Sequence, residues 1–115
     1  MKTAILFAGQ GAQFVGMGKD LYENFKTAKD YFDRAEEILK TPIKSICFDG
    51  PEDKLKMTEN TQPAILITSY ICYKLLEEKG VKRDAYAGFS LGEYSALTAA
   101  GIINFEDGLK IVRER

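Results

Sequence analysis

The sequence predicts an α/β fold that contains a parallel sheet. Residues 4–8 form a continuous apolar run that ends at Gly9, which is typical of a strand buried on both faces of such a sheet. A second strand is expected at residues 85–88, and a helix at residues 91–100 follows it directly. The order in this second region is therefore strand, turn, helix.

Between the first strand and the first long helix, the chain is rich in glycine. Residues 9–18 are expected to form a loop, or a loop that runs into a short helix. Apolar residues at helical spacing then predict a helix over residues 27–40. Thr27, followed three residues later by Asp30, resembles a capping box at its start.

Prolines divide the middle of the chain. Pro42 and residues 48–51 interrupt the segment after the first long helix, and residues 51–55 are expected to form a short helical turn. Residues 61–63, Thr-Gln-Pro, predict the start of a long apolar helix, because proline is suited to the first helical turn. Lys79 and Gly80 predict its end.

The C-terminal region predicts two further helices. The helix at residues 91–100 should end at Gly101, and Asn104 with Asp107 should cap a final helix. This last helix is still in progress at Arg115, so we expect the chain to be part of a longer protein.

Composition favours one globular unit, residues 1–115, over two. With 16 basic and 17 acidic residues interspersed, the charge pattern argues against a nucleic-acid partner. Cys47 and Cys72 form no CxxC pair and the sequence has no histidine, so neither a zinc site nor a disulfide framework is expected. The longest apolar stretches are too short for a membrane span or a signal peptide, which predicts a soluble cytoplasmic protein.

A Gly-x-Ser-x-Gly motif at residues 88–92 is the first feature that indicates chemistry. In a nucleophile elbow the serine occupies a sharp turn between a strand and a helix, and glycines on both sides allow the close approach. Ser90 is therefore a candidate nucleophile, with the backbone N–H of Leu91 as an oxyanion donor. The alternative is a chance match, which the strand-turn-helix context makes less probable.

A second glycine motif, Gly9-Gln10-Gly11, follows the first strand. It could indicate a dinucleotide site, but Phe14 occupies the position of the third glycine and the Walker pattern is absent. Alternatively, such a loop brings a backbone N–H, here that of Gln10, to the acyl oxygen as a second oxyanion donor.

Taken together, the segments Phe-Ala-Gly-Gln-Gly-Ala-Gln (7–13), Thr-Gln-Pro-Ala (61–64) and Gly-Phe-Ser-Leu-Gly-Glu-Tyr-Ser-Ala-Leu (88–97) resemble the ordered signature of malonyl-CoA:acyl carrier protein transacylases. Acyltransferase domains of polyketide synthases share it. The resemblance implies that residues 1–115 are the N-terminal part of a large, α/β-hydrolase-like subdomain. A smaller ferredoxin-like subdomain would lie outside this chain.

The resemblance also implies roles for individual residues. Ser90 would accept the acyl group, and the backbone amides of Gln10 and Leu91 would form the oxyanion hole. Gln62 would lie near the substrate, and Arg115 would bind the malonyl carboxylate, a task that suits a planar guanidinium. Malonyl-CoA and acyl carrier protein are the implied partners in fatty acid synthesis, and no metal or other cofactor is implied.

The sequence departs from the family pattern at Ala8, where proline is usual, and at Phe89, where histidine is usual. A larger departure is the absence of any histidine, because family members use a downstream histidine as the general base. We therefore expect the 115 residues alone to be inactive and to need a C-terminal segment of the same enzyme. Three alternatives remain at this stage: a serine hydrolase, a non-catalytic binding domain and a nucleotide-binding protein.

Overall fold

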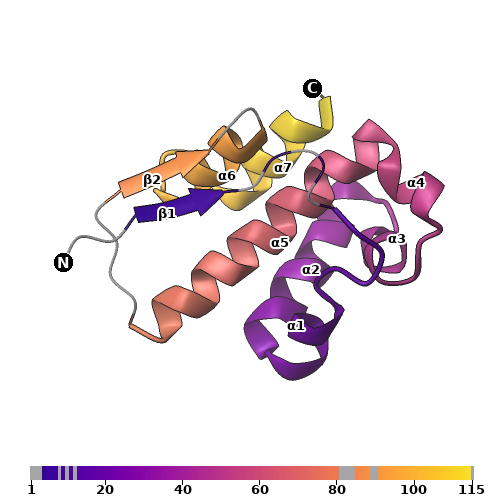
Figure 1. The fold of residues 1–115 in the computed structure, drawn as a ribbon, viewed down its shortest axis with the longest axis horizontal. Coiled ribbons are helices and arrows are strands. Elements are labelled where there is room, and N and C mark those ends of the chain that lie inside the picture. The colour runs from indigo at the N-terminus through magenta and orange to yellow at the C-terminus, as the bar shows by residue number, and fades with distance from the viewer. Residues whose placement is uncertain are drawn as a thin grey trace.

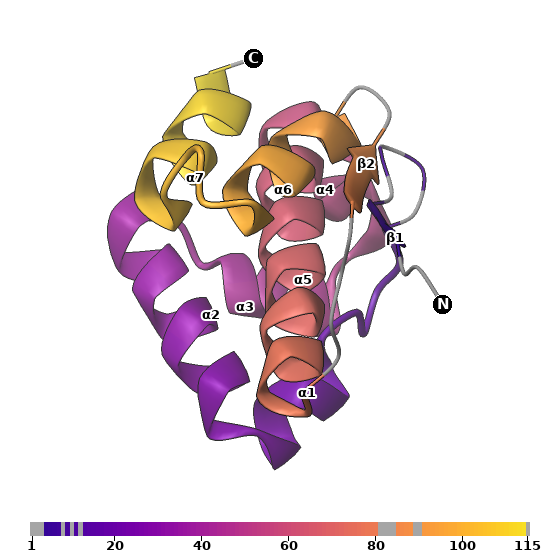
Figure 2. The ribbon, with the colours of Figure 1, turned by 90° about the vertical axis from the view of Figure 1, so that its left-hand side faces the viewer.

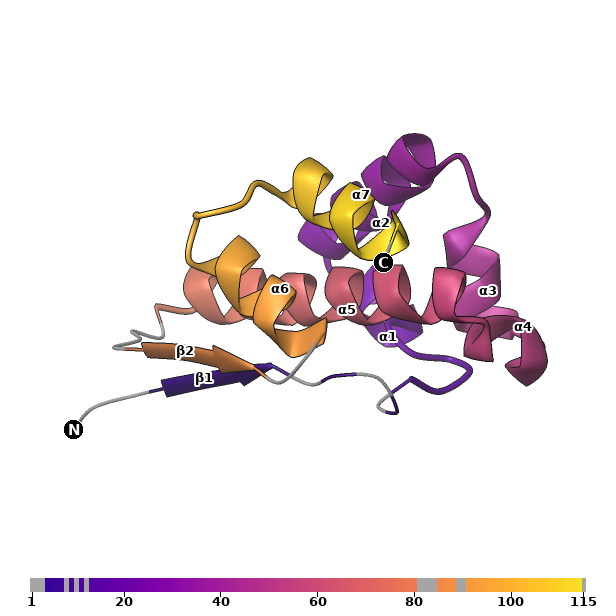
Figure 3. The same ribbon diagram turned by 90° about the horizontal axis from the view of Figure 1, so that it is seen from above.

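The computed structural model describes residues 4–7, 9, 11, 13–80, 85–88 and 91–114. They form a two-stranded parallel sheet and a set of helices that lie on one side of it (Figures 1 and 3). In chain order the elements are β1 (Ala4–Phe7), α1 (Lys19–Asn24), α2 (Lys26–Leu39), α3 (Ile43–Asp49), α4 (Glu52–Lys56), α5 (Thr58–Glu78), β2 (Ala85–Gly88), α6 (Leu91–Ala99) and α7 (Phe105–Glu114).

Helix α5 is the centre of the structure. Residues 60–67 are all buried, so this stretch is covered on every face of the helix. Figure 2 shows α5 with α2 and α7 on one side and the two strands on the other. A helix that is apolar all round needs partners on all sides, which explains why the other helices gather around it.

The sheet confirms the predicted strands and corrects one expectation about them. β1 pairs with β2 in parallel, with Ala4 opposite Ala85 and Phe7 opposite Gly88. Side chains alternate along a strand, and here Phe7 is buried whereas Leu6 is 78% exposed. The expectation that this strand is buried on both faces was therefore wrong for the described residues, whose helices cover one face.

Two helix starts differ from the predictions. The Thr27 hydroxyl donates to Glu78 Oε1 on α5 at 2.6 Å, and the N-cap of α2 is Phe25, without a side-chain cap, so the capping box was wrong. Helix α5 begins at Thr58, before the predicted Thr-Gln-Pro start, and includes Pro63. The predicted cap of the last helix is confirmed, since Asp107 N–H donates to Asn104 Oδ1 at 2.8 Å.

Aromatic contacts fix the first turn of α7 against the core. The ring of Phe105 lies 5.2 Å from that of Tyr70 on α5 and 5.0 Å from that of Tyr31 on α2, measured between centroids. Tyr31 and Tyr70 also meet edge to face at 5.2 Å. Three helices are thus joined by one cluster of rings, a geometry that adds to the stabilisation from burial alone.

Helices α6 and α7 approach each other closely at Gly108. A Cβ atom added there would lie 2.8 Å from Thr98 Oγ1 on α6. We expect Gly108→Ala to lower the free energy of unfolding by about 1–3 kcal/mol, because the packed interface has no room for a methyl group. Urea denaturation measures this.

The matched background is Thr98→Ala, which removes the atom that the new methyl group would meet. In that background Gly108→Ala should lose most of its destabilising effect. An equal loss in both backgrounds would show that the close approach is not the cause.

Candidate active site

The two glycine motifs follow neighbouring strands at the same edge of the sheet. Because β1 and β2 are parallel and Phe7 pairs with Gly88, both strands end at this edge. The Gly-Gln-Gly loop begins two residues after Phe7, and the turn to α6 begins after Gly88. Ligands of parallel α/β sheets bind at the carboxyl ends of the strands, so this edge is the candidate active site.

The strand predicted before Ser90 and the helix predicted after it are confirmed. Gly88 is the last residue of β2 and Leu91 is the first residue of α6, whereas residues 89 and 90 lie outside the described residues. The N–H groups in the first turn of a helix have no partner within the helix and lie at the positive end of its dipole. This arrangement can stabilise an oxyanion that forms next to residue 90.

Several predicted site residues lie outside the described residues. They are Gln10, Phe89, Ser90 and Arg115, together with Ala8, so their assigned roles stay predictions. For Leu91 the structure describes the backbone, as the first residue of α6.

Gln62 is described, and its side chain is buried. The residue is 7% exposed, and its Oε1 atom has no hydrogen-bond partner among the residues that the structure describes. Its neighbours in α5 are satisfied: Asn60 Nδ2 donates to the carbonyl of Lys54 at 2.9 Å, and Thr61 Oγ1 donates to that of Leu55. A buried polar atom without a partner costs free energy. Thr68 Oγ1, Ser95 Oγ and Arg113 Nη1 are in the same condition among the described residues, so the role of Gln62 at the substrate stays a prediction.

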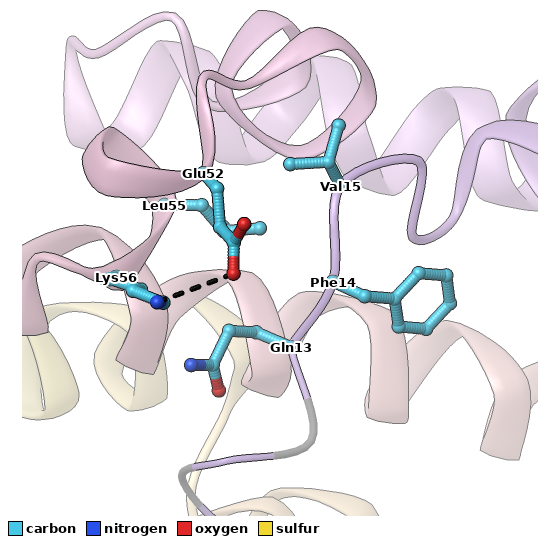
Figure 4. A pocket seen from close by; sticks show the side chains of 6 residues that line it. All are labelled: Gln13, Phe14, Val15, Glu52, Leu55 and Lys56. Carbon is cyan, nitrogen blue, oxygen red and sulfur yellow. Dashed lines mark ion pairs between the residues drawn. The ribbon is translucent and has the colours of Figure 1, made fainter.

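Two of the described glycines after β1 have hydrogen-bonded N–H groups. Gly11 N–H donates to Gln13 Oε1 at 2.7 Å, and Gly16 N–H donates to the carbonyl of Cys47 on α3 at 2.7 Å. Gln13 also lines a hollow of about 230 Å³ beside the Glu52–Lys56 ion pair (Figure 4). Sequence analysis gave Gln13 no role, although it lies in the quoted motif.

The last turn of α7 is tied to the turn between α2 and α3. Arg113 Nη2 donates to Thr41 Oγ1 at 3.1 Å, and Thr41 Oγ1 donates to the carbonyl of Leu39 at 3.1 Å. This link restrains the end of the helix that immediately precedes Arg115 in sequence.

The shortest ion pair among the described residues joins Lys44 on α3 to Asp33 on α2. Lys44 Nζ lies 2.6 Å from Asp33 Oδ1 and 3.3 Å from the Tyr22 hydroxyl. The hydrogen bond from Lys44 lowers the pKa of Asp33, and the same bond raises the pKa of Lys44. Because each charge already has its partner, this cluster stabilises the packing of α2 on α3 and is not a candidate for catalysis.

Neither a metal site nor a membrane-spanning helix is found among the described residues. No group of three His, Cys, Asp or Glu side chains there could hold a metal ion. Among the same residues, no helix combines the length and the apolar character of a membrane span.

Comparison with known proteins agrees with this geometry. Residues 5–115 match the family model of the acyl transferase domain. The malonyl CoA-acyl carrier protein transacylase of Bacillus subtilis is 50% identical over 114 residues, which are 99% of this chain and 36% of that protein.

Solved structures give the same result. A malonyl CoA-acyl carrier protein transacylase from Clostridium perfringens superposes with a TM-score of 0.94 at 49% identity, over 99% of this chain and 36% of that one. A malonyl-transacylase in complex with its type II PKS acyl-carrier protein superposes with a TM-score of 0.94 at 37% identity, over 99% of this chain and 37% of that one. The chain thus spans little more than a third of the length of these relatives. It belongs to the acyl transferase domain family, and it corresponds to the N-terminal part of malonyl CoA-acyl carrier protein transacylases.

Proposed function

We propose that the protein containing this chain transfers a malonyl group from malonyl-CoA to the phosphopantetheine thiol of acyl carrier protein, in fatty acid synthesis. The observation that supports the proposal is the shared edge of β1 and β2: the Gly-Gln-Gly segment follows β1 in sequence, and Ser90 lies in sequence between β2 and α6. A relative with this fold was solved together with its acyl-carrier protein, which supports the choice of acceptor.

The reaction would proceed in two transfers at Ser90. The serine oxygen attacks the malonyl thioester carbonyl while its proton passes to a general base, and the C–S bond breaks to release CoA as a thiol. The phosphopantetheine thiol then attacks the malonyl-serine ester, and the serine hydroxyl is restored. The N–H groups of Leu91 and Gln10 would stabilise the oxyanion in both steps, and a single such donor contributes about 3–4 kcal/mol.

The substrate would be bound at its two ends by polar side chains. Arg115 would hold the malonyl carboxylate through two parallel N–H···O bonds. Gln62, whose Oε1 atom has no partner, would complete its hydrogen bonding with the substrate or with a group beside it. No cofactor besides the substrate is required for this chemistry.

The general base must come from outside these 115 residues if it is a histidine, since the sequence contains none. We assign residues 1–115 to the N-terminal part of an α/β-hydrolase-like large subdomain, and a ferredoxin-like small subdomain to the remainder. The matched relatives are long enough to supply both, because this chain covers 36% of their length.

An open groove marks where that remainder would pack. It runs between β1 and α5, has a volume of about 240 Å³, and is lined by side chains that include Leu6, Cys72 and Leu76. Leu6 and Leu76 are 78% and 41% exposed, an arrangement that favours burial by a further segment. We place the C-terminal part of the same enzyme, in the cytoplasm, over this groove.

Replacing the nucleophile tests the reaction. Ser90→Ala in the full-length enzyme should lower malonyl transfer by about 10⁴-fold or more, because no other group can form the ester. Intact mass spectrometry after incubation with malonyl-CoA should show a malonyl adduct on the wild type and none on the variant.

The 115-residue chain alone should form no adduct, because it lacks the base. Transfer of label to water in place of carrier protein would instead indicate a hydrolase. An adduct that persists in Ser90→Ala would contradict the proposed nucleophile.

Substitution of Gln62 gives a second test, because it should lower the activity without lowering the stability. Gln62→Met fills the same volume without a buried, unpaired oxygen, so the free energy of unfolding should stay constant or rise by about 1 kcal/mol. Malonyl transfer should fall about 10-fold, the effect of one lost hydrogen bond in the transition state.

Asn60→Ala is the matched control in the same helix turn. It removes the shorter of two hydrogen bonds to the carbonyl of Lys54, which keeps the bond from Met57 N–H at 3.3 Å, so it should lower stability by about 1 kcal/mol. If Gln62→Met is also destabilising and leaves transfer intact, Gln62 has a structural role.

The two cysteines report on the groove. Cys72 is exposed on α5, although partial desolvation raises the pKa of its thiol; Cys47 is buried, and burial raises the pKa of its thiol to about 12. In the folded 115-residue chain, Cys72 should react with a thiol reagent and Cys47 should not.

In the full-length enzyme we expect Cys72 to react at least about 10-fold more slowly, since the added segment would exclude the reagent. Cys47 serves as the check that the chain is folded, because it becomes reactive on unfolding. Equal Cys72 rates in both proteins would contradict the assignment of the groove.

A further inference from the structure

Two side chains near the start of α5 bond to the last turn of α4. Asn60 Nδ2 donates to the carbonyl of Lys54 at 2.9 Å, and Thr61 Oγ1 donates to the carbonyl of Leu55. The last carbonyls of a helix have no partner within that helix, and side chains of a following element can satisfy them. The beginning of α5 is therefore attached to α4 through side-chain hydrogen bonds.

These two bonds are not equivalent. The Lys54 carbonyl also accepts the N–H of Met57 at 3.3 Å, so it keeps a partner without Asn60. For the Leu55 carbonyl, Thr61 Oγ1 is the one donor among the described residues. Thr61 is 0% and Leu55 is 1% exposed, so water cannot take the place of the hydroxyl. The Thr61 bond is thus the part of this junction that nothing else replaces.

Pro63 makes the junction important for the direction of the first turn of α5. Proline lies inside this helix and has no N–H to donate to the carbonyl of Glu59, four residues earlier. The first turn is therefore joined to the rest of α5 by one backbone hydrogen bond fewer than in a regular helix. Bonds to other elements, such as the one from Thr61, must contribute more to holding it.

Gln62 lies in sequence between Thr61 and Pro63. The backbone of this turn sets the direction in which the Gln62 side chain leaves the helix, because each Cα–Cβ bond has a fixed direction relative to the helix axis. In Figures 1 and 3 both strands point toward the end of α5 at which α4 lies. A tilt of the first turn would therefore move Gln62 relative to the strand edge that forms the candidate active site.

We infer that Thr61 is a positioning residue for acyl transfer: its hydroxyl, bonded to the Leu55 carbonyl, fixes the start of α5 and so holds Gln62 in place for the substrate. This inference rests on the proposed function, in which Gln62 completes its hydrogen bonding at the substrate. A polar group that is held in place before the reaction stabilises the transition state without further reorganisation, so Thr61 should act on kcat.

The test compares two substitutions in the full-length enzyme. Thr61→Val has nearly the same volume and removes the donor, whereas Thr61→Ser keeps it. We expect Thr61→Val to lower kcat about 3- to 10-fold with KM for malonyl-CoA changed less than about 2-fold, and Thr61→Ser to retain most of kcat. The rate of malonyl adduct formation in a single turnover should fall in parallel.

A double-mutant cycle with Gln62→Met separates positioning from stability. In the Gln62→Met background, Thr61→Val should cause no further loss of kcat, because the side chain that it positions is gone. Its effect on the midpoint of urea denaturation should persist in that background, since the bond to Leu55 does not involve Gln62. A purely structural residue would instead lower kcat by the same factor in both backgrounds.

Thr98→Val is the matched control. Thr98 is 3% exposed and its Oγ1 donates to the carbonyl of Tyr94 at 2.7 Å, so the substitution removes a buried hydroxyl that bonds to a backbone carbonyl elsewhere in the core. It should leave kcat and KM unchanged.

The outcomes separate this inference from the function on which it rests. Unchanged kcat in Thr61→Val, an equal loss in Thr61→Val and Thr61→Ser, or the same loss with and without Gln62 would each overturn the positioning role. Normal kcat in Gln62→Met would overturn it as well. Full activity of Ser90→Ala would overturn the proposed function itself. Loss of activity in Ser90→Ala and Gln62→Met with normal kcat in Thr61→Val would leave the function standing and remove the inference alone.

Discussion

The burial of α5 on all its faces is the constraint on which the rest of the structure depends. Ile65, Leu66, Ile67 and Ile71 are at most 2% exposed, and they point in different directions around the helix axis. Burying each such side chain contributes about 1.5–3 kcal/mol relative to leaving it in water. The sheet and the surrounding helices are therefore arranged so that no face of this segment is left open.

That arrangement has consequences for the candidate active site. The start of α5 carries Gln62, and the cluster of Tyr31, Tyr70 and Phe105 holds α7 against the same helix. The strands lie on the opposite side of α5, with α6 packed across both of them (Figure 3). One buried helix thus sets the positions of the strand edge, the first turn of α6 and the helix that leads to Arg115.

The described chain is well packed on one side and open on the other. Its helices cover one face of the sheet, and the groove beside β1 exposes Leu6 and Leu76. Parallel sheets generally have both faces covered, whereas β1 has one face open among the described residues. The open face of the sheet and the buried helical core thus lie on opposite sides of the described chain, which spans just over a third of its relatives' length.

Sequence alone determined the local features that depend on residue type. Strand 85–88, the helix after it, the cap at Asn104 and the short turn after Pro51 follow from propensity and from side-chain hydrogen bonds within a few residues. Ser90 and Gln10 came from glycine motifs, whereas Arg115 came from the resemblance to a known family alone. The structure adds a strand before Ser90 and a helix after it.

Tertiary structure decided what depends on distant partners. Thr27 bonds to Glu78, 51 residues away, and so does not cap its own helix. Helix α3, over Ile43–Asp49, was not predicted, and it buries Ile43 and Ile46 against the core. The exposure of Leu6 and the unpaired oxygen of Gln62 likewise follow from which elements pack against which. Spacing along a chain fixes the face on which a residue lies, but the fold alone fixes what meets that face.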